Sequence, residues 1–318
     1  MAPHSEYVRF ATSRDGTRIA WTVCGSGPPL LWRSHHLNHL RHDWESSVWA
    51  HWLQLLSRRH TLYRYDWRGA GLSDRDPPEF SLERYLEDME AVIQAAGLDR
   101  FTLAGHSGGG MICAAYAAGH PEQVERLLLC NCPSRGASKR FPHQRAEELH
   151  GRLTLIGLSE HGDIPAYEKF FTTYHMFDAT KEQQASLSDF FRKSISGERF
   201  KDIVLSHSRT DIRSLLPNVR CPTLILHALD DPNIEFAEGR ALAAGIPGSQ
   251  LVPLASRHHL MTATETAWTE AKRAIEQFLP VVENAAVTEQ ITAREKEVLA
   301  VLASGATNTA IAARDRKS

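Results

Sequence analysis

The chain has few cysteines, no long apolar run and almost no net charge, and each of these features argues against a class of protein. The five cysteines are scattered and odd in number, so a disulfide framework is not expected and a reducing cytoplasm is the expected compartment. No apolar run has the length of a membrane span, and the first residues lack the pattern of a signal peptide. The formal net charge of −2 gives no electrostatic reason to expect nucleic-acid binding by the whole chain.

The composition is otherwise that of an ordinary globular protein. Hydrophobic residues make up 42% and charged residues 23% of the sequence. A length of 318 residues allows one large α/β domain with a small appendage. Cys130 and Cys132 lie on one face of a strand-like run, and we interpret them as buried small apolar groups rather than a disulfide.

Strand patterns alternate with helix patterns along most of the chain. Asp15 and Gly16 form a turn signal that joins the first two strand patterns into a hairpin, and Ser81 and Gly97 are expected to cap one helix. The expected strands are residues 7–12, 17–24, 30–32, 60–65, 101–104, 124–130, 223–227 and 250–253, and the expected helices are residues 48–56, 81–96, 111–118 and 266–278. The alternation predicts the α/β class, with a mostly parallel central sheet flanked by helices.

Residues 133–216 interrupt this alternation with helical patterns and no clear strand. We interpret them as a helical cap inserted over the edge of the sheet, and their many aromatic residues are more typical of the insertion's own core than of a substrate wall. The expected domains are a core of residues 1–132 and 217–281, a helical cap of residues 133–216, and a tail of residues 282–318. Within the core, Asp66 and Arg68 are expected to hold a turn.

The most informative motif is a G-x-S-x-G match over residues 105–109, between a strand pattern and a helix pattern. In this context the motif predicts a sharp turn that exposes the hydroxyl of Ser107 at the end of the strand. The N-terminus of the following helix offers unpaired N–H groups that suit a developing oxyanion. A tight turn without chemistry is the alternative for the motif alone, so the downstream partners decide.

A serine hydroxyl needs a base, which is usually a histidine oriented by a carboxylate. In the chain order that accompanies this motif, the acid follows a late strand and the histidine comes last. Asp230 and Asp231 occupy the first of these positions, and His258 and His259 occupy the second. Three other carboxylates are alternatives without such positional support: Asp99, Asp202 and Asp211.

A histidine-rich stretch at residues 35–42 invites interpretation as a metal site. His35, His36, His39 and His42 have spacings that could place two imidazoles on one helical face. No cysteine or well-placed carboxylate completes a tetrahedral set, and the stretch has the composition of a loop. We therefore expect no metal and no cofactor.

Taken together, these motifs resemble the α/β-hydrolase fold superfamily, and more narrowly the bacterial α/β-hydrolase domains that are fused to LuxR-type helix-turn-helix regulators or to nucleotide cyclases. The matching segments are residues 43–46, 65–74, 105–109, 227–231 and 254–259. The resemblance implies a serine hydrolase with Ser107 as the nucleophile, Asp231 as the acid and His259 as the base.

The oxyanion hole of this fold uses the N–H of the residue after the nucleophile, here Gly108, and one N–H from the loop after an early strand. The resemblance places His36 at this second position. Most members carry His-Gly in that loop, whereas this chain carries Ser34, His35 and His36. The remaining candidates for the substrate pocket are His35, His106 and His258.

The tail resembles the opening of a LuxR-type helix-turn-helix. Thr292 and Glu295 form a capping box at the start of a helical pattern, and Gly305 ends that pattern. The recognition helix that would enter the major groove is expected after residue 314 and is absent, so we interpret the tail as a truncated remnant. Specific nucleic-acid binding by this form is therefore not expected.

The serine at the turn indicates the class of reaction, because dehalogenases and epoxide hydrolases of this fold use aspartate there. Ser107 therefore favours a carboxylic-ester hydrolase that acts through an acyl-enzyme on a small-molecule ester or related acyl substrate. The alternative is a hydrolase-like small-molecule sensor domain of a transcriptional regulator, with little turnover. Neither hypothesis involves a membrane, and both are compatible with a homodimer.

Overall fold

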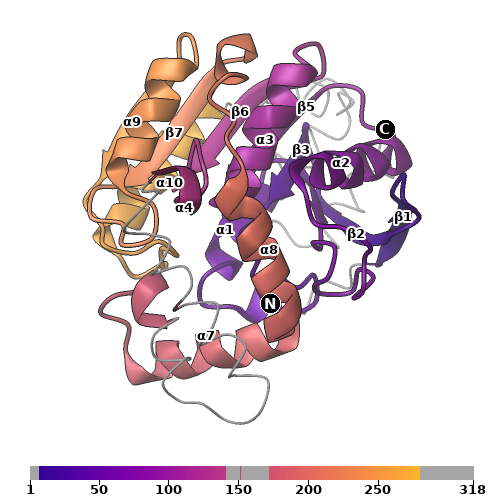
Figure 1. Ribbon diagram of the computed structural model, residues 1–318. Coiled ribbons are helices and arrows are strands. Elements are labelled where there is room, and N and C mark those ends of the chain that lie inside the picture. Colours follow the sequence, from indigo (N-terminus) through magenta and orange to yellow (C-terminus); the bar gives the residue numbers. More distant parts are fainter. Residues whose placement is uncertain (1–6, 141–150, 152–171, 280–318) are drawn as a thin grey trace, which may run out of the picture. The chain divides into compact units, whose positions relative to one another are not determined.

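One sheet forms the centre of the described part of the chain (Figure 1). The computed structural model describes residues 7–140, 151 and 172–279. The strands are β1 (Arg9–Thr12), β2 (Arg18–Gly25), β3 (Pro29–Arg33), β4 (Thr61–Tyr65), β5 (Phe101–His106), β6 (Val124–Cys130), β7 (Thr223–Ala228) and β8 (Gln250–Leu254). They lie in the order β1-β2-β4-β3-β5-β6-β7-β8, and all pairs are parallel except β1–β2 and β2–β4. The predicted α/β class and mostly parallel sheet are confirmed.

Helices flank this sheet on both faces (Figure 1). The described helices are α1 (Ala50–Ser57), α2 (Leu82–Ala96), α3 (Gly108–Gly119), α4 (Ala137–Arg140), α7 (Lys181–Ser194), α8 (Gly197–Arg209), α9 (Phe236–Gly245) and α10 (Thr266–Phe278), of which α1, α2, α3, α9 and α10 flank the sheet. Trp52 of α1 packs on Trp268 of α10 with ring centroids 4.8 Å apart, so these two helices share one face. Helices α2, α3 and α9 cover the other face. Because both faces are covered, every residue of β5 and of β7 is buried.

The local signals in the sequence act as expected. Gly16 has a φ of 89° in the β1–β2 turn, and Gly97 has a φ of 65° at the end of α2. The Ser81 hydroxyl accepts a hydrogen bond from the Arg84 N–H at 3.3 Å, which caps the start of α2. One expectation is corrected: β6 ends at Cys130 because Asn131 has a φ of 47°, so Cys132 lies beyond the strand. Both cysteines are buried and free, as interpreted.

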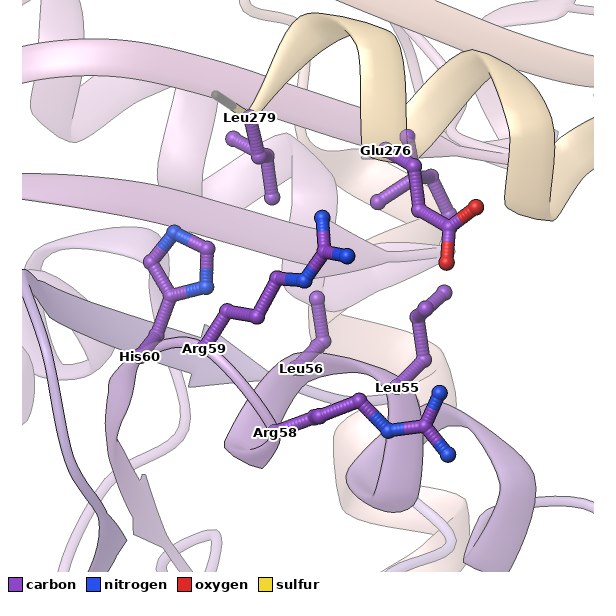
Figure 2. Close-up of a pocket in the computed structure, with 8 residues that line it drawn as sticks. Leu55, Leu56, Arg58, Arg59, His60, Glu276 and Leu279 are labelled. Atoms are coloured by element: carbon purple, nitrogen blue, oxygen red, sulfur yellow. The ribbon is translucent and has the colours of Figure 1, made fainter. Parts of the chain in front are cut away.

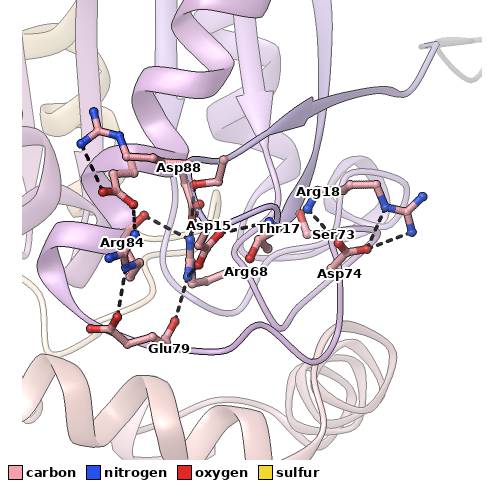
Figure 3. Close-up of polar contacts among 12 residues, drawn as sticks. Asp15, Thr17, Arg18, Arg68, Ser73, Asp74, Glu79, Arg84 and Asp88 are labelled. Atoms are coloured by element: carbon pink, nitrogen blue, oxygen red, sulfur yellow. Dashed lines mark hydrogen bonds and ion pairs between the residues drawn. The ribbon is translucent and has the colours of Figure 1, made fainter.

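A paired network of charges fixes the β1–β2 hairpin to the loop after β4 and to α2 (Figure 3). The fully buried Arg68 side chain donates to Asp88 at 2.7 and 2.8 Å and to Asp15 at 2.8 Å. In the same loop, Asp66 accepts from the Leu72 N–H at 2.7 Å. The expected turn-holding role of Asp66 and Arg68 is therefore present in the structure.

The segment between β6 and β7 contains α4, α7 and α8, together with the 3₁₀ helix η2 (Leu216–Asn218). Backbone contact joins it to the loop after β4, where the Gly71 N–H donates to the Ser194 carbonyl at 2.8 Å. Its aromatic residues differ in burial, since Phe190 and Phe191 are buried whereas Phe177 is 47% exposed.

The chain divides into two compact units, Met1–Pro280 and Val281–Ser318. The predicted helix-turn-helix remnant lies in the second unit, outside the described residues. Among the helices that the structure does describe, none is long and apolar enough to cross a membrane.

Candidate active site

Ser107 lies in the tight turn between β5 and α3, with a φ of 54° and a ψ of −130°. The glycines on either side make this turn sterically feasible. A Cβ atom on Gly105 would lie 2.6 Å from the Cα of Gly110, and one on Gly109 would lie 2.3 Å from the Ser34 carbonyl oxygen. The sequence therefore forces a non-glycine residue into a strained conformation at the end of a buried strand.

Three predicted residues meet in one chain of hydrogen bonds. The Oγ atom of Ser107 lies 2.9 Å from Nε2 of His259, and Nδ1 of His259 lies 2.7 Å from Oδ2 of Asp231. Asp231 follows β7 and His259 follows β8, so all three residues lie at the carboxyl ends of parallel strands. The Asp231 carboxylate accepts Nδ1–H, which leaves Nε2 free to accept the serine proton.

Burial sets the protonation of this group. Burial raises the pKa of the Asp231 carboxyl to about 6, while the N–H groups of Asn233 and Ile234, at 2.8 and 3.0 Å, favour its ionised form. Burial lowers the pKa of the His259 imidazole well below its ordinary value. His259 is therefore neutral at neutral pH, which is the form that can take a proton from Ser107.

A residue that sequence reasoning missed holds the acid and base segments together. Asn131 directly follows β6, and its Oδ1 accepts the N–H of Ala228, at the end of β7, at 2.8 Å. Its Nδ2 donates to the carbonyl oxygen of His259 at 2.8 Å. The positive φ of Asn131, which asparagine adopts more readily than most residues, turns its amide between the two segments.

The alternative carboxylates lie elsewhere. Asp230 is exposed, and its N–H donates to the Ser256 carbonyl. Asp202 pairs with Arg199 at 3.1 Å and Asp211 pairs with Arg213 at 2.7 Å, while Asp99 is exposed. The structure thus brings Asp231, and none of these four, to His259.

His258 has a different environment from its neighbour. Its Nε2 atom contacts the Asp178 carboxylate, and its Nδ1 atom lies 2.7 Å from Oε1 of Glu265. A backbone bridge between Met176 and His258 joins the inserted segment to this loop. Burial alone would lower the pKa of His258, but the carboxylates of Glu265 and Asp178 raise it above its ordinary value. The structure therefore places His258 in an ion-pair cluster.

Two N–H groups are available where an oxyanion hole is predicted. Gly108 is the first residue of α3, and His36 follows β3. Among the described residues, neither N–H donates to a backbone carbonyl. The loop path is fixed without the usual glycine, because the Trp67 indole N–H donates to the Ser34 carbonyl at 3.3 Å and the Leu37 N–H donates to Nδ1 of His35 at 3.1 Å.

Imidazole rings surround the three hydrogen-bonded residues. The His35 and His106 rings lie 5.6 and 5.2 Å from the His259 ring, measured between centroids, and the His36 ring lies 3.7 Å from that of His35. The inserted segment adds His175, which is 5.6 Å from His259. Within the part of the chain that the structure describes, no group of three or more potential ligands is arranged to hold a metal.

The inserted segment also adds His207, which comes from α8. Neither His175 nor His207 has a positional signal in the sequence, because both come from a segment whose placement depends on tertiary packing. Burial lowers the pKa of His35, His36 and His106 well below the ordinary value and that of His207 to about 3. The surroundings of Ser107 are therefore rich in hydrogen-bonding groups that carry no charge.

A separate pocket lies between the ends of α1 and α10 (Figure 2). It is lined by Leu55, Leu56, Arg58, Arg59, His60, Ile275, Glu276 and Leu279. None of these residues belongs to the segments that carry Ser107, Asp231 or His259, so this pocket has no part in the site described above.

The chain is similar in sequence to several hydrolases. The putative carbamate hydrolase RutD of Klebsiella pneumoniae is 28% identical over 234 residues, which cover 71% of this chain and 85% of the relative. The bifunctional esterase/perhydrolase DCH of Acinetobacter calcoaceticus is 23% identical over 269 residues, which cover 80% and 94% of the two chains.

Solved structures share the fold. The esterase EaEST from Exiguobacterium antarcticum superposes with a TM-score of 0.71 at 22% identity, over 86% of this chain and 99% of its own. The family described as alpha/beta hydrolase fold matches residues 42–261, which span the serine turn and both of its hydrogen-bonded partners. The chain therefore belongs to the alpha/beta hydrolase fold family.

Proposed function

We propose that this protein is a carboxylic-ester hydrolase in which Ser107, His259 and Asp231 act as a catalytic triad. The observation that carries the proposal is the continuous hydrogen-bonded path from Ser107 Oγ through His259 to the buried Asp231 carboxylate. Both distances lie within the range needed for proton transfer and orientation. The strained turn at Ser107 adds a second feature that is typical of nucleophilic serines in this fold.

The proposed reaction has two balanced halves. In the first, Oγ of Ser107 attacks the ester carbonyl carbon while Nε2 of His259 takes the hydroxyl proton, and the alkoxide then leaves with that proton as an alcohol. In the second, water loses a proton to Nε2 and attacks the acyl-enzyme, which releases the acid and returns the proton to Ser107. The N–H groups of Gly108 and His36 stabilise the oxyanion in both halves, and Asp231 stabilises the imidazolium.

Esters are preferred over carbamates and amides on chemical grounds, because an alkoxide leaves more easily than an amine. The names of the relatives support hydrolysis at a carbonyl, since one is an esterase/perhydrolase and another a putative carbamate hydrolase. The enclosed site, in which the Ser107 side chain is largely buried and His259 is fully buried, favours small to medium acyl groups. We assign residues 133–216 as the cap that sets this size.

The test is hydrolysis of a p-nitrophenyl ester series, from short to long acyl chains, by the wild type and by Ser107→Ala. We expect rapid turnover of the shorter esters and loss of turnover in the variant, while its melting temperature stays close to that of the wild type. Undiminished turnover in Ser107→Ala would disprove the proposed nucleophile.

A second candidate function is a small-molecule sensor with little turnover, in a cytoplasmic regulator. It is favoured by the capping box of Thr292 and Glu295, which resembles the start of a LuxR-type helix-turn-helix and lies outside the described residues. A sensor would bind its ligand tightly and hydrolyse it slowly. Negligible turnover of every ester, together with a raised melting temperature when a ligand binds, would favour this function.

A further inference from the structure

The side chain of His207 lies directly against the first residue of α3. A Cβ atom on Gly108 would lie 2.4 Å from Cε1, 2.5 Å from Nδ1 and 3.4 Å from Nε2 of His207. The ring edge that carries both nitrogens therefore faces the residue whose N–H we assign to the oxyanion hole. A side chain at position 108 would therefore displace the imidazole of His207.

Polar atoms without partners gather at this place. Among the described residues, Nε2 of His207 is buried and has no hydrogen-bond partner, and the same is true of both ring nitrogens of His36. The two rings lie 6.1 Å apart between centroids. A buried polar atom without a partner destabilises the fold. Three of them beside a strained, nucleophilic serine indicate that their partner arrives with the substrate.

The position of His207 indicates which half of a substrate it would contact. The leaving group receives its proton from His259, whose ring neighbours are His35, His106 and His175. The ring neighbours of His207 are instead His36, Trp67 and Tyr85. His207 therefore lies on the acyl side of the oxyanion hole.

The chemistry of the surroundings narrows the group that His207 can bind. Trp67 and Tyr85 lie 5.1 and 5.3 Å from its ring, and Phe200 lies 4.9 Å from the ring of His36, so the walls are aromatic. A neutral imidazole donates one hydrogen bond and accepts another. It therefore complements a hydroxyl or keto oxygen of the acyl group, which can accept a hydrogen bond from the ring and, as a hydroxyl, donate one to it.

We propose that His207, together with His36, selects acyl groups that carry a hydroxyl or keto oxygen close to the scissile carbonyl over plain alkanoyl groups. The inference rests on the proposed ester hydrolysis at Ser107 and defines its substrate class. His207 acts on specificity, by pairing with the oxygen of the acyl group, and takes no part in proton transfer.

The test compares two esters of equal chain length and identical leaving group, p-nitrophenyl 3-hydroxybutanoate and p-nitrophenyl butanoate. We expect the wild type to favour the hydroxylated ester about tenfold in kcat/KM, the effect of one hydrogen bond to a buried group. His207→Leu removes both nitrogens and should bring this ratio close to one. His207→Gln keeps a side-chain amide and should retain part of the preference.

A matched control is His120→Leu, at the end of α3, where the histidine ring stacks on Tyr116 at 4.1 Å. It should leave the ratio unchanged. A wild-type ratio near one, or an unchanged ratio in His207→Leu, would overturn the inference.

The inference stays testable if the proposed function fails. Should no p-nitrophenyl ester be hydrolysed, binding is measured in the Ser107→Ala protein with methyl 3-hydroxybutanoate and methyl butanoate. The hydroxylated ester should raise the melting temperature more, and His207→Leu in the same background should abolish the difference. Equal shifts with the two esters would overturn the role of His207 independently of turnover.

Discussion

Two fully buried arginines, Arg68 and Arg33, have opposite surroundings, and the contrast separates two kinds of buried polar region. Arg68 donates to the carboxylates of Asp88 and Asp15 and to the Glu79 carbonyl, so its charge is paired on every side (Figure 3). The three guanidinium nitrogens of Arg33 have no hydrogen-bond partner among the described residues.

The guanidinium of Arg33 instead lies over the rings of Trp67 and Tyr65, 3.5 and 4.3 Å from their centroids. The paired region joins a hairpin, a loop and a helix, which is a structural task. The unpaired region borders the histidine-rich surroundings of Ser107, where Trp67 also contacts His36 and His207. The charges of the structural region are thus paired by hydrogen bonds, whereas the buried polar groups that border the candidate site are not.

The largest effect is expected at the buried acid of the site. Asp231→Asn should lower kcat about ten-thousandfold, because an amide selects the wrong tautomer of His259 and cannot stabilise its imidazolium form. The measurement is steady-state hydrolysis of the best p-nitrophenyl ester. Asp230→Asn, at the exposed neighbouring position, is the control and should change kcat less than about twofold. Near wild-type activity in Asp231→Asn would contradict the assignment.

Removing the ion pairs of Arg68 should lower the stability of the fold. Arg68→Met leaves the buried Asp88 carboxylate without its partner and should lower the free energy of unfolding by about 3–5 kcal/mol. Chemical denaturation followed by circular dichroism measures this loss. The activity per folded molecule should be retained, because Arg68 touches no residue of the site. An Arg68→Met protein as stable as the wild type would contradict the structural role of these ion pairs.

The protonation of the site predicts an acid limb in the pH profile. The pKa of Asp231 is raised to about 6 by burial and that of His259 is lowered, so the neutral imidazole and ionised carboxylate persist through neutral pH. We expect kcat/KM to be level above neutrality and to fall about tenfold per pH unit below about pH 6. Circular dichroism at each pH excludes unfolding, and a limb centred above neutrality would contradict this account.

Arg33→Met is the counterpart of Arg68→Met, because Arg33 is buried without hydrogen-bond partners among the described residues. Arg33→Met removes a buried charge and breaks no hydrogen bond to a carboxylate, because among the described residues the Arg33 guanidinium has no hydrogen-bond partner and lies over aromatic rings, while Asp88 keeps its hydrogen bonds to Arg68. The free energy of unfolding should change by only about 1 kcal/mol, since the lost cation–π contact is offset by the relief of burying a charge. Denaturation under the same conditions as for Arg68→Met measures it. Equal losses in the two variants would show that pairing is not what distinguishes the regions.

The smallest effect is expected at His258. Its pKa is raised by Glu265 and Asp178, so the charged form stabilises the fold below the unfolded-state pKa, and this contribution is lost as the pH rises through the folded-state pKa. Arg257 also faces Asp178 and lowers the pKa of its carboxyl together with His258. His258→Gln should lower the melting temperature by about 2 °C at low pH and leave it unchanged at high pH. A pH-independent difference would contradict the ion-pair role.

The sequence predicts the sheet well, because the sheet depends on local signals, and the same signals single out three residues that lie in one hydrogen-bonded group. Strand patterns, turn glycines and chain order place Ser107, Asp231 and His259 after three different parallel strands, and parallel strands bring their carboxyl ends to one edge. The choice of Asp231 over Asp230 rested on resemblance, and the structure adds the reason: only Asp231 is buried against His259.

The surroundings of Ser107 could not be predicted in the same way. His175 and His207 reach the site because the inserted segment packs over α3, and no spacing in the sequence encodes that packing. The environment of His258 depends on Asp178, eighty residues away in the chain. The end of β6 depends on the positive φ of Asn131, which follows from the hydrogen bonds its amide makes across two other segments.

The amide of Asn131 has a consequence for how this protein can be engineered. It binds both the end of β7 and the His259 loop, so His259 is held in place by a residue outside the stretch of chain that connects Asp231 to His259. Helix α9 and the turn into β8 lie within that connection. Lengthening or grafting the turn at its exposed positions 247 and 248 should therefore be tolerated, provided that Asn131 is kept.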